Sequence, residues 1–485
     1  MSEGEEKVPK VAVPVKEEVS SNSTFSSVNN VSSGFFNKSL IGVLLAIIAY
    51  FCIFYQASSP EINIDACGDF CDQIIKENPV ITTSTVSVEK IITSVVTETA
   101  PVVTKIVTKA ANSSNYQSDP EGLHSVQFVN NNEMTIMVRP DDYQMPSSDI
   151  SQGVIHPEDD GIREKAVMVT LCRNSDLWTL VKTIRDIEDR FNHRYHYDWV
   201  FLNEIDFTDE FIRVTSSLCS GKTKYGLIPE EHWSEPDYID VEKFEKIRDE
   251  MFDKEVLYGE SISYRHMCRF QAGFLFRHPM LAEYDYYWRV DADINIFCNL
   301  PYDIFKFMRI NKKKYGFILS LTEYETTIPT LWGHIKNFTS IHPEYLHENN
   351  LMDFISDDDG ETFNGCHFWS NFEVADLNFF RSQAYTDYFD YLDKTGNFFY
   401  ERWGDAPIHS IAATLFLDSS EVHFFDGLGF YHPDFLSCPT EENIRIQNQC
   451  SCEPERDVTW WSFYFCTRQY FRVGGLELPP DVIPF

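Results

Sequence analysis

The clearest pattern of hydrophobic and polar positions begins near residue 165. "KAVMVTLCRN" is a short apolar run that ends in polar residues, as a buried parallel strand does. In the next stretch, "DLWTLVKTIRDIEDRFN", apolar residues recur at helical spacing, and Asp176 is placed to cap the helix. "YDWVFLN" is a second buried strand. A strand, a helix and a strand joined by short links predict a βαβ unit of an α/β sheet.

Several later stretches extend this sheet. "TKYGLIP", "YYWRV" and "KYGFILSL" have the composition of further strands, and "SYRHMCRFQAGFLF" and "FEVADLNFFRSQAYTDYFDYLDK" have apolar residues at helical spacing. We therefore expect one large α/β domain over residues 161–485.

The part of the chain before this domain has a different composition. Residues 40–57 include "LIGVLLAIIAYFCIFY", a run without a charge that is just long enough to span a bilayer. Because a polar segment, residues 1–39, precedes it, the run favours a retained signal anchor over a cleaved signal peptide. We expect residues 1–39 to be a disordered cytosolic tail. Residues 58–160 are Thr- and Val-rich and predict a lumenal stem and linker, of the kind that carries O-linked glycans.

Charge and cysteine content narrow the picture further. The net charge of −35 argues against nucleic acid as a partner, because Lys and Arg supply most of that affinity. Of the twelve cysteines, Cys52 lies in the predicted span and the others would face an oxidising lumen. We expect these cysteines to form disulfides, and four of them lie close together near the C-terminus. Zinc is the alternative, although no double C-x-x-C array is present.

Two carboxylates interrupt the strand stretch "YYWRVDADINIFCNLP". Asp291 and Asp293 come at its end, and ionised carboxylates are costly to bury unless they find a partner. In such sheets ligands bind beyond the carboxyl ends of the strands, where Arg173 would also lie. Carboxylates at positions i and i+2 there are typical of a site for a hard divalent cation that faces a diphosphate. The D-x-D pattern alone is weak evidence, since "SDDDG" at 356–360 repeats it in what we interpret as a solvated loop.

The sequence resembles a known family over about residues 160–470. The matching stretches include "SYRHMCRFQAGFLFRHPML", "YYWRVDADINIFCNLPYDIFKFM", "CHFWSNFEVADLNFF" and "FYHPDFLSCP". Together they are similar to the fungal GDP-mannose-dependent α-1,2-mannosyltransferases, glycosyltransferase family 15. The resemblance implies a GT-A-like fold, with a central mixed sheet flanked by helices, in a type II Golgi membrane protein. It also implies Mn²⁺ as the metal, GDP-mannose as the donor, and transfer with retention of configuration.

The resemblance also implies roles for particular residues. Asp291, Asp293 and His432 match the metal and donor site, although Asp-Ala-Asp stands where the family usually has Glu-Pro-Asp. The shorter carboxylate and the missing proline, which would fix φ, put metal geometry and donor fit in question. Glu373 matches the family's proposed nucleophile. For His432 the alternative is a structural histidine, and for Glu373 it is an acid at the start of a helix.

Three further residues are implied to face the donor. Tyr264 and Arg265, in "SYRHMCRF", match residues near the reaction centre and the nucleotide, and an arginine fork suits a diphosphate. Arg173 is expected near the nucleotide from its position after the first strand. An ordinary polar and aromatic helix face is the alternative for Tyr264 and Arg265.

The predicted function is therefore enzymatic. The protein would move mannose from GDP-mannose to a mannose hydroxyl of N- or O-linked glycans on glycoproteins, and one transmembrane helix would hold it in the Golgi membrane. Two alternatives remain open from the sequence. One is transfer of mannosyl phosphate to the same glycans. The other is a catalytically weak glycan-binding partner, which only the Asp-Ala-Asp departure supports.

Overall fold

The computed structural model describes residues 126–130, 133–137, 143–461 and 463–482. The predicted tail, the predicted anchor and most of the predicted stem lie outside these residues. Within the described part of the chain, no helix is long and apolar enough to cross a membrane. Two short strands, β1 (Val126–Asn130) and β2 (Glu133–Met137), pair as an antiparallel hairpin.

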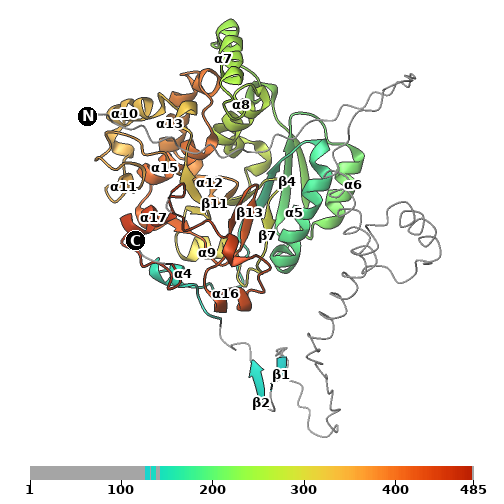
Figure 1. Ribbon diagram of the computed structural model, residues 1–485. Helices are drawn as coiled ribbons and strands as arrows, with labels where there is room; N and C mark the ends of the chain where they lie inside the picture. The colour runs from blue at the N-terminus through green and yellow to red at the C-terminus, as the bar shows by residue number, and fades with distance from the viewer. Residues whose placement is uncertain (1–125, 131–132, 138–142, 462, 483–485) are drawn as a thin grey trace, which may run out of the picture. The chain divides into compact units, whose positions relative to one another are not determined.

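The centre of the fold is a seven-stranded sheet in the order β12-β8-β11-β6-β3-β4-β5 (Figure 1). Four neighbouring strands, β6, β3, β4 and β5, are parallel, whereas β11 runs antiparallel to β6 and β8. The amino end of β11 therefore meets the carboxyl end of β6. The bounds are β3 (Ala166–Leu171), β4 (Asp198–Asn203), β5 (Thr223–Leu227), β6 (Tyr286–Val290), β8 (Tyr315–Phe317), β11 (Phe372–Asp376) and β12 (Val422–Phe424).

The expected mixed α/β sheet and its first βαβ unit are confirmed. Helix α5 (Leu177–Arg190) joins β3 to β4, and its apolar stripe is buried at Leu180, Ile184 and Ile187. The Asp176 side chain differs from expectation, because it accepts a hydrogen bond from the Arg173 amide instead of capping the helix.

One helix prediction is wrong over its first residues. The stretch that begins at Phe372 forms strand β11 before α12 (Leu377–Phe380) and α13 (Gln383–Asp393) begin. Its side chains are buried on both faces of the sheet, so the alternation that marks a half-exposed strand is missing. Pairing with β6 and β8 then outweighs the local helical spacing. Similarly, "KYGFILSL" contains two strands, β8 and β9 (Ser320–Thr322).

Helices cover both faces of the sheet (Figure 1). One apolar core packs α5, α6 (Asp209–Leu218) and α9 (Ile304–Ile310) against side chains such as Trp199 and Trp288. The other packs α8 (Ile262–Arg269), α10 (Leu331–Ile341), α13 and α15 (Asp405–Phe416) against Tyr287 and Tyr315. The sheet is thus buried on both sides, which leaves its edges as the place for polar chemistry.

Smaller elements surround these layers. Strand β13 (Phe430–His432) pairs with β14 (Phe435–Ser437) and with β7 (Asn295–Ile296), and β9 pairs with β10 (Cys366–Phe368). The remaining helices are α7 (Val241–Asp253), α11 (Met352–Ile355), α14 (Asn397–Tyr400), α16 (Glu442–Gln447) and α17 (Thr467–Val473).

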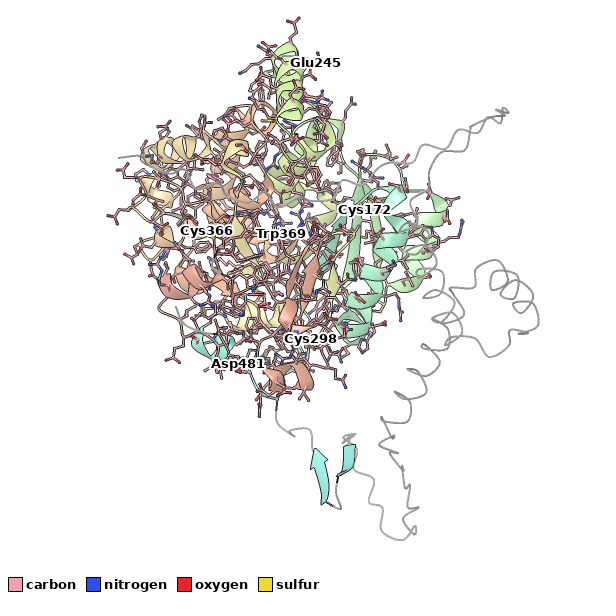
Figure 2. All side chains as sticks on the ribbon, in the orientation of Figure 1. Cys172, Glu245, Cys298, Cys366, Trp369 and Asp481 are labelled. Carbon is pink, nitrogen blue, oxygen red and sulfur yellow. A yellow bond between two sulfur atoms is a disulfide. The ribbon has the colours of Figure 1, made fainter. Side chains whose placement is uncertain are left out.

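Three disulfides join distant parts of the chain: Cys298–Cys450, Cys366–Cys466 and Cys438–Cys452. They use all four cysteines near the C-terminus, so the preference for disulfides is confirmed for the described residues. Cys298 and Cys366 are labelled in Figure 2, as is Cys172, one of three described cysteines that carry a free thiol. The bonds at Cys298 and Cys366 attach the C-terminal segment to the central part of the domain.

The packed fold includes residues that the sequence assigns to the linker. Helix α4 (Ser147–Ser151) has Ser148 and Asp149 fully buried. The Ser148 hydroxyl donates to Asp426 over 3.0 Å, and the Gln152 side chain exchanges two hydrogen bonds with the Phe424 backbone. The Pro-, Gly- and acid-rich composition suggests a linker because it is typical of irregular backbone. Irregular backbone can still be buried when its polar groups form hydrogen bonds with the rest of the domain.

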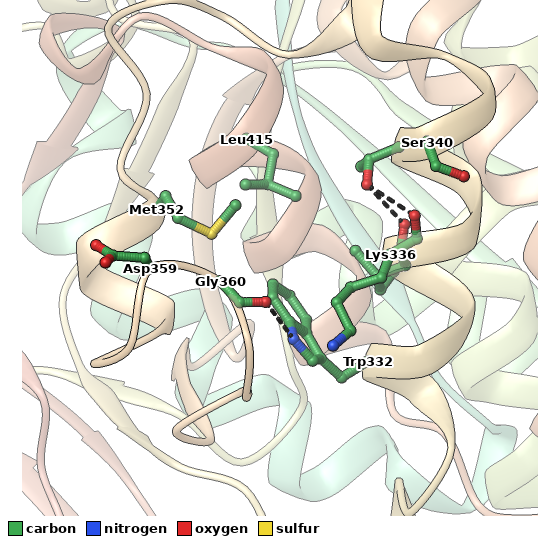
Figure 3. A pocket seen from close by; sticks show the side chains of 9 residues that line it. Trp332, Lys336, Ser340, Met352, Asp359, Gly360 and Leu415 are labelled. Carbon is green, nitrogen blue, oxygen red and sulfur yellow. Dashed lines mark hydrogen bonds between the residues drawn. The ribbon is translucent and has the colours of Figure 1, made fainter.

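A hollow of about 290 Å³ lies between α10 and the loop after α11 (Figure 3). Its lining includes Trp332, Lys336, Met352 and Asp359, and the Trp332 indole donates to the Gly360 carbonyl over 3.1 Å. None of the predicted site residues lines it.

Asp426 makes stability depend on pH. Burial, reinforced by the nearby Asp149 carboxylate, raises its pKa to about 7. The folded chain then binds a proton that the unfolded chain releases near pH 4, so the free energy of unfolding falls as pH rises from about 4 to about 7. We expect Asp426→Asn to flatten this fall and to stabilise the protein at pH 7.5, relative to wild type, by roughly 2–4 kcal/mol.

Urea unfolding at pH 5 and pH 7.5 measures this effect. Asp426→Asn should keep a smaller part of the slope, because burial also raises the pKa of Asp457, to about 6. An Asp426→Asn variant with the wild-type difference between the two pH values would contradict the assignment.

Candidate active site

The candidate site lies at the edge where the parallel strands end. Asp291 follows the last residue of β6, and Arg173 comes two residues after β3. The segment 369–371 leads into β11, whose first residue, Phe372, pairs with Val290. The strand order thus brings three separate pieces of sequence to one place.

Arg289 connects this edge to the interior. It lies within β6 and is 5% exposed. Its Nε and Nη2 atoms donate to the Asp291 carboxylate over 2.9 and 3.2 Å. Its Nη1 atom donates to the buried Asp405 carboxylate and, over 3.0 Å, to the Ser370 hydroxyl. Asp405 is the first residue of α15, where the helix dipole favours a negative charge.

The charged groups of this cluster keep one another ionised. Burial would lower the pKa of Arg289, but the Asp291 and Asp405 carboxylates outweigh that effect and raise it. Burial would raise the pKa of Asp405, but Arg289, with contributions from His409 and Ser370, lowers it. Arg289 and Asp405 are therefore both ionised, as a buried pair must be to offset the cost of leaving water.

The two acids of the Asp-Ala-Asp turn have different partners. Asp291 accepts from Arg289 and, over 2.9 Å, from the Asn371 amide. Asp293 is about half exposed, and its Oδ1 lies 3.3 Å from His432 Nε2. The predicted trio thus meets at one edge, but only Asp293 and His432 are paired directly. Among the described residues, no three His, Cys, Asp or Glu side chains are close enough together to enclose a metal ion.

The Asp293–His432 pair has the chemistry of a manganese site. Two ligands bound at right angles to one small divalent cation lie about 3 Å apart, close to the 3.3 Å between these atoms. His432 Nδ1 is 3.1 Å from the Pro433 carbonyl, which favours a proton on Nδ1 and a lone pair on Nε2. The Trp369 ring meets the His432 imidazole edge-on at 4.8 Å and limits its rotation.

The turn between the two acids is supported from α5. The Thr183 hydroxyl lies 2.9 and 2.8 Å from the carbonyl oxygens of Ala292 and Ile294. The Ala292 side chain packs against the core on that face of the sheet. These contacts fix the backbone that a proline would otherwise restrict.

Glu373 lies behind this edge and is fully buried. Its carboxylate accepts hydrogen bonds from the Tyr287 and Tyr315 hydroxyls, the latter over 2.6 Å, and lies 2.8 Å from His409 Nδ1. Since Glu373 is inside β11, the alternative of an acid at the start of a helix is wrong. In this arrangement the carboxylate is enclosed by protein, without a surface for a substrate.

A shared proton completes the Glu373 cluster. His409 Nε2 is 3.1 Å from the Gln271 carbonyl, an acceptor, so this nitrogen carries a hydrogen. Its Nδ1 also faces an oxygen, of Glu373, so one more proton lies on either the imidazole or the carboxyl group. Burial raises the pKa of Glu373, against the lowering effect of His409, which favours keeping that proton. The cluster ties β11, β6 and β8 to α15 and to the π-helical turn Phe270–Phe274 after α8.

Tyr264 and Arg173 lie on one side of the site. Arg173 is exposed, and its Nη2 donates over 2.9 Å to the hydroxyl of Ser263, the residue before Tyr264. The Tyr264 ring lies under the Arg402 guanidinium at 5.2 Å, and Arg402 is 3.8 Å from the Glu323 carboxylate. Burial raises the pKa of Tyr264 well above its usual value, so its hydroxyl remains a proton donor.

Arg265 has a structural environment, which differs from the expectation that it binds the donor. Its side chain is fully buried, and its nitrogens donate to the carbonyls of Ser261, Phe399 and Glu401 over 3.1–3.2 Å. These contacts hold α8 against α14, and they use the donors that a diphosphate would need. The next residue on a helix points about 100° away, so Tyr264 and Arg265 belong to different faces.

Several residues of this site were not predicted from the sequence: Arg289, Ser370, Asn371 and Arg402. The signal for Arg289 was present, because an arginine inside an apolar strand needs a buried carboxylate, and an acid follows two residues later. Asn371 and Ser370 carry no such signal. Asn371 becomes a neighbour of Asp291, and Ser370 a neighbour of Arg289, only because β11 is antiparallel to β6.

The chain has clear relatives. A family model described as "Glycolipid 2-alpha-mannosyltransferase" matches residues 123–475. The chain belongs to this family. It is 66% identical to the probable mannosyltransferase KTR3 of Saccharomyces cerevisiae over 341 residues, which cover 70% of this chain and 84% of that protein. It is 57% identical to the alpha-1,2 mannosyltransferase KTR1 of the same yeast, over 67% of this chain and 82% of that one.

The fold is shared with a solved structure of the same family. The crystal structure of core-mannan synthase A from Aspergillus fumigatus, in its Mn/GDP form, has a TM-score of 0.61 and 33% identity. The match covers 74% of this chain and all of that chain. The resemblance seen in the sequence and the expected GT-A-like α/β fold are therefore confirmed for this mannosyltransferase.

The buried ion pair of the site gives a stability prediction. Asp405→Ala leaves the Arg289 charge buried with one partner fewer, and we expect it to lower the free energy of unfolding by roughly 3–5 kcal/mol. The double variant Arg289→Met/Asp405→Leu removes both charges and should recover part of that loss. Urea unfolding of the three proteins provides the values. A loss below about 1 kcal/mol in Asp405→Ala, or a double variant no better than the single one, would contradict the account.

Proposed function

We propose that this mannosyltransferase moves mannose from GDP-mannose to a mannose hydroxyl of N- or O-linked glycans, forming α-1,2 linkages with retention. The observation that carries the proposal is the pairing of Asp293 with His432 at the sheet edge of a family member. The comparisons confirm the predicted family and the mannosyltransferase class, and the Mn/GDP form of core-mannan synthase A supports a GDP-linked donor and manganese for this chain.

Asp293 and His432 would hold the manganese ion, with Asp291 beside them. The Asp291 carboxylate offers about four acceptor positions and uses three of them on Arg289 and Asn371, so one is still available to a cation or a donor hydroxyl. When bound, the ion supplies positive charge to the diphosphate of the donor. Arg173, exposed beyond β3, is placed to donate to the same diphosphate.

Other residues orient the reacting groups. Tyr264 keeps its proton and faces Arg402 and Glu323, so in this proposal its hydroxyl donates to the substrate near the reaction centre.

Glu373 acts as a positioning residue. By holding Tyr287, Tyr315 and His409, it fixes β6 and α15, which carry Arg289 and Asp405. The acceptor hydroxyl then attacks C1 of the mannose on the face from which GDP leaves, the bond from C1 to the diphosphate oxygen breaks, and the departing diphosphate takes up the hydroxyl proton.

We propose a type II topology for the whole chain. Residues 1–39 form the cytosolic tail, 40–57 the signal anchor in the Golgi membrane, and 58–160 the lumenal stem and linker, whose last part packs with the lumenal catalytic domain of residues 161–485. Three disulfides support an oxidising compartment for this domain. The packing of α4 supports counting residues from about 143 onward with the domain.

The first experiment measures mannose transfer by the full-length chain in detergent. Radiolabelled GDP-mannose and α-methyl mannoside are supplied with Mn²⁺, and EDTA is added in a parallel sample. We expect a neutral labelled disaccharide that disappears with EDTA. A charged labelled product would instead indicate mannosyl phosphate transfer, and GDP binding without any transfer would indicate a glycan-binding partner.

Two variants test the metal site in that assay. Asp293→Ala and His432→Ala each remove a ligand, and we expect at least a tenfold loss of Mn²⁺-dependent transfer, as for other losses at metal sites. Asp357→Ala, in the exposed D-x-D triplet of "SDDDG", is the matched control and should keep wild-type activity. Full activity of Asp293→Ala, or a large loss in Asp357→Ala, would contradict the proposal.

Two variants of Glu373 distinguish a positioning role from a nucleophilic one. We expect Glu373→Gln to lower the melting temperature and kcat, with the KM for GDP-mannose nearly unchanged, because the carboxylate holds other residues and does not contact the donor. Glu373→Ala with added azide distinguishes the two roles. A nucleophile can be replaced by azide, which would yield a mannosyl azide, whereas a positioning residue cannot. Formation of mannosyl azide by Glu373→Ala, and not by wild type, would overturn the positioning role.

A further inference from the structure

An exposed aromatic surface lies next to the candidate active site. We call Tyr324, Trp461 and Phe463 the aromatic rim. Their side chains are 49%, 58% and 90% exposed. Exposed aromatic side chains of this size are costly to hydrate, and when several gather they mark a binding surface more often than isolated apolar residues do. Two of them lie in "DVTWWSFYFC", a segment to which no role was assigned from the sequence.

The segment that carries Trp461 and Phe463 is fixed at both ends. At its start, the Val458 amide donates to the Leu436 carbonyl over 2.9 Å. At its end, the Thr322 amide donates to the Tyr464 carbonyl over 3.0 Å, and Cys466 forms a disulfide with Cys366. Trp461 and Phe463 therefore lie between anchored positions, and their neighbours Trp460 and Phe465 are buried in the core.

A chain of ring contacts joins the rim to the candidate metal site. The Trp461 ring contacts Phe465, Phe465 contacts Phe435 at 5.1 Å, and Phe435 contacts Trp369 at 5.4 Å. Trp369, labelled in Figure 2, then meets His432. Tyr324 joins the same group through a side-chain hydrogen bond with Tyr464. Packed rings thus connect the Trp461 end of the rim to the place where the donor is proposed to bind.

We propose that the aromatic rim binds the acceptor, by stacking on mannose residues that precede the one receiving the new sugar. The proposal rests on the proposed function. A neutral mannose chain offers hydroxyl groups and apolar C–H faces but no charge, and aromatic rings match those faces. An acceptor whose terminal mannose lies near His432 would extend across the rim, so the rim favours chains of two or more mannoses over a single mannoside.

The charge of the segment favours a neutral glycan over a membrane surface as the partner of the aromatic rim. Loops that enter a lipid headgroup layer usually carry Lys or Arg beside their aromatic residues. The segment "DVTWWSFYF" contains neither, and the chain as a whole has a net charge of −35. Anionic lipid would be repelled, whereas a neutral glycan would not.

The test compares acceptors of different length, using full-length protein in detergent. KM is measured for α-methyl mannoside, for an α-1,2-linked mannotriose and for GDP-mannose, in wild type, Trp461→Ala, Phe463→Ala and the double variant. We expect the double variant to raise KM for the mannotriose about 5- to 30-fold, as loss of two stacked rings would. KM for α-methyl mannoside and for GDP-mannose should change less than about twofold.

The controls separate binding from folding. Phe463→Tyr keeps a ring and should keep the wild-type KM, and Phe252→Ala removes a side chain on α7 that is 63% exposed and should change none of the three constants. The melting temperature of Phe463→Ala should equal that of wild type, because the ring is almost fully exposed.

Each contrary result has a distinct meaning. If wild type transfers mannose but the rim variants keep its KM for mannotriose, the inference is overturned and the proposed function stands. The same holds if the variants change only the KM for GDP-mannose, or only the oligomeric state or the association with vesicles of anionic lipid. If wild type transfers mannose to none of the acceptors, the proposed function itself fails.

Discussion

The structure of the candidate site depends on one buried arginine. Arg289 lies inside β6 and binds Asp291 at the sheet edge and Asp405 at the start of α15. Because a guanidinium has a rigid, planar arrangement of donors, these contacts fix directions as well as distances. The cost of burying the charge is offset only while both carboxylates remain in place. The central strand β6, the Asp-Ala-Asp turn and α15 therefore keep one geometry relative to one another.

A second buried cluster fixes the positions of further strands and helices in the core. Glu373, together with Tyr287, Tyr315 and His409, ties three strands to α15 and to the π-helical turn that follows α8. Tyr264 is on α8 and Asp405 is on α15, so this second cluster braces both helices that carry residues of the site. Asp293 and Arg173, which are exposed, and the partly buried His432 are left to meet the substrate. The division between buried carboxylates that position and exposed ones that bind follows from the cost of desolvating charge.

Much of this arrangement could be predicted from the sequence, and the exceptions have physical causes. The βαβ unit follows from apolar periodicity, and Asp291, Asp293 and Arg173 follow from the rule that ligands bind at strand ends. The direction of β11 could not be inferred, because its residues are buried on both faces and show no alternation. For the same reason Asn371 was missed. Glu373 was expected at the reacting centre because it matches the family's proposed nucleophile, and the structure buries it inside β11. Arg265 and Tyr264 are adjacent in sequence, yet only the packing of α14 decides that the arginine faces inward.

The central claim is that Asp293 and His432 form the metal site of a GDP-mannose-dependent transferase. A crystal structure of the protein with Mn²⁺ and GDP, with the manganese located by anomalous scattering, tests it most directly. The account predicts an anomalous peak within about 2.3 Å of an Asp293 oxygen and of His432 Nε2, and in contact with the diphosphate. A peak distant from both residues, or one at the "SDDDG" loop, would contradict it.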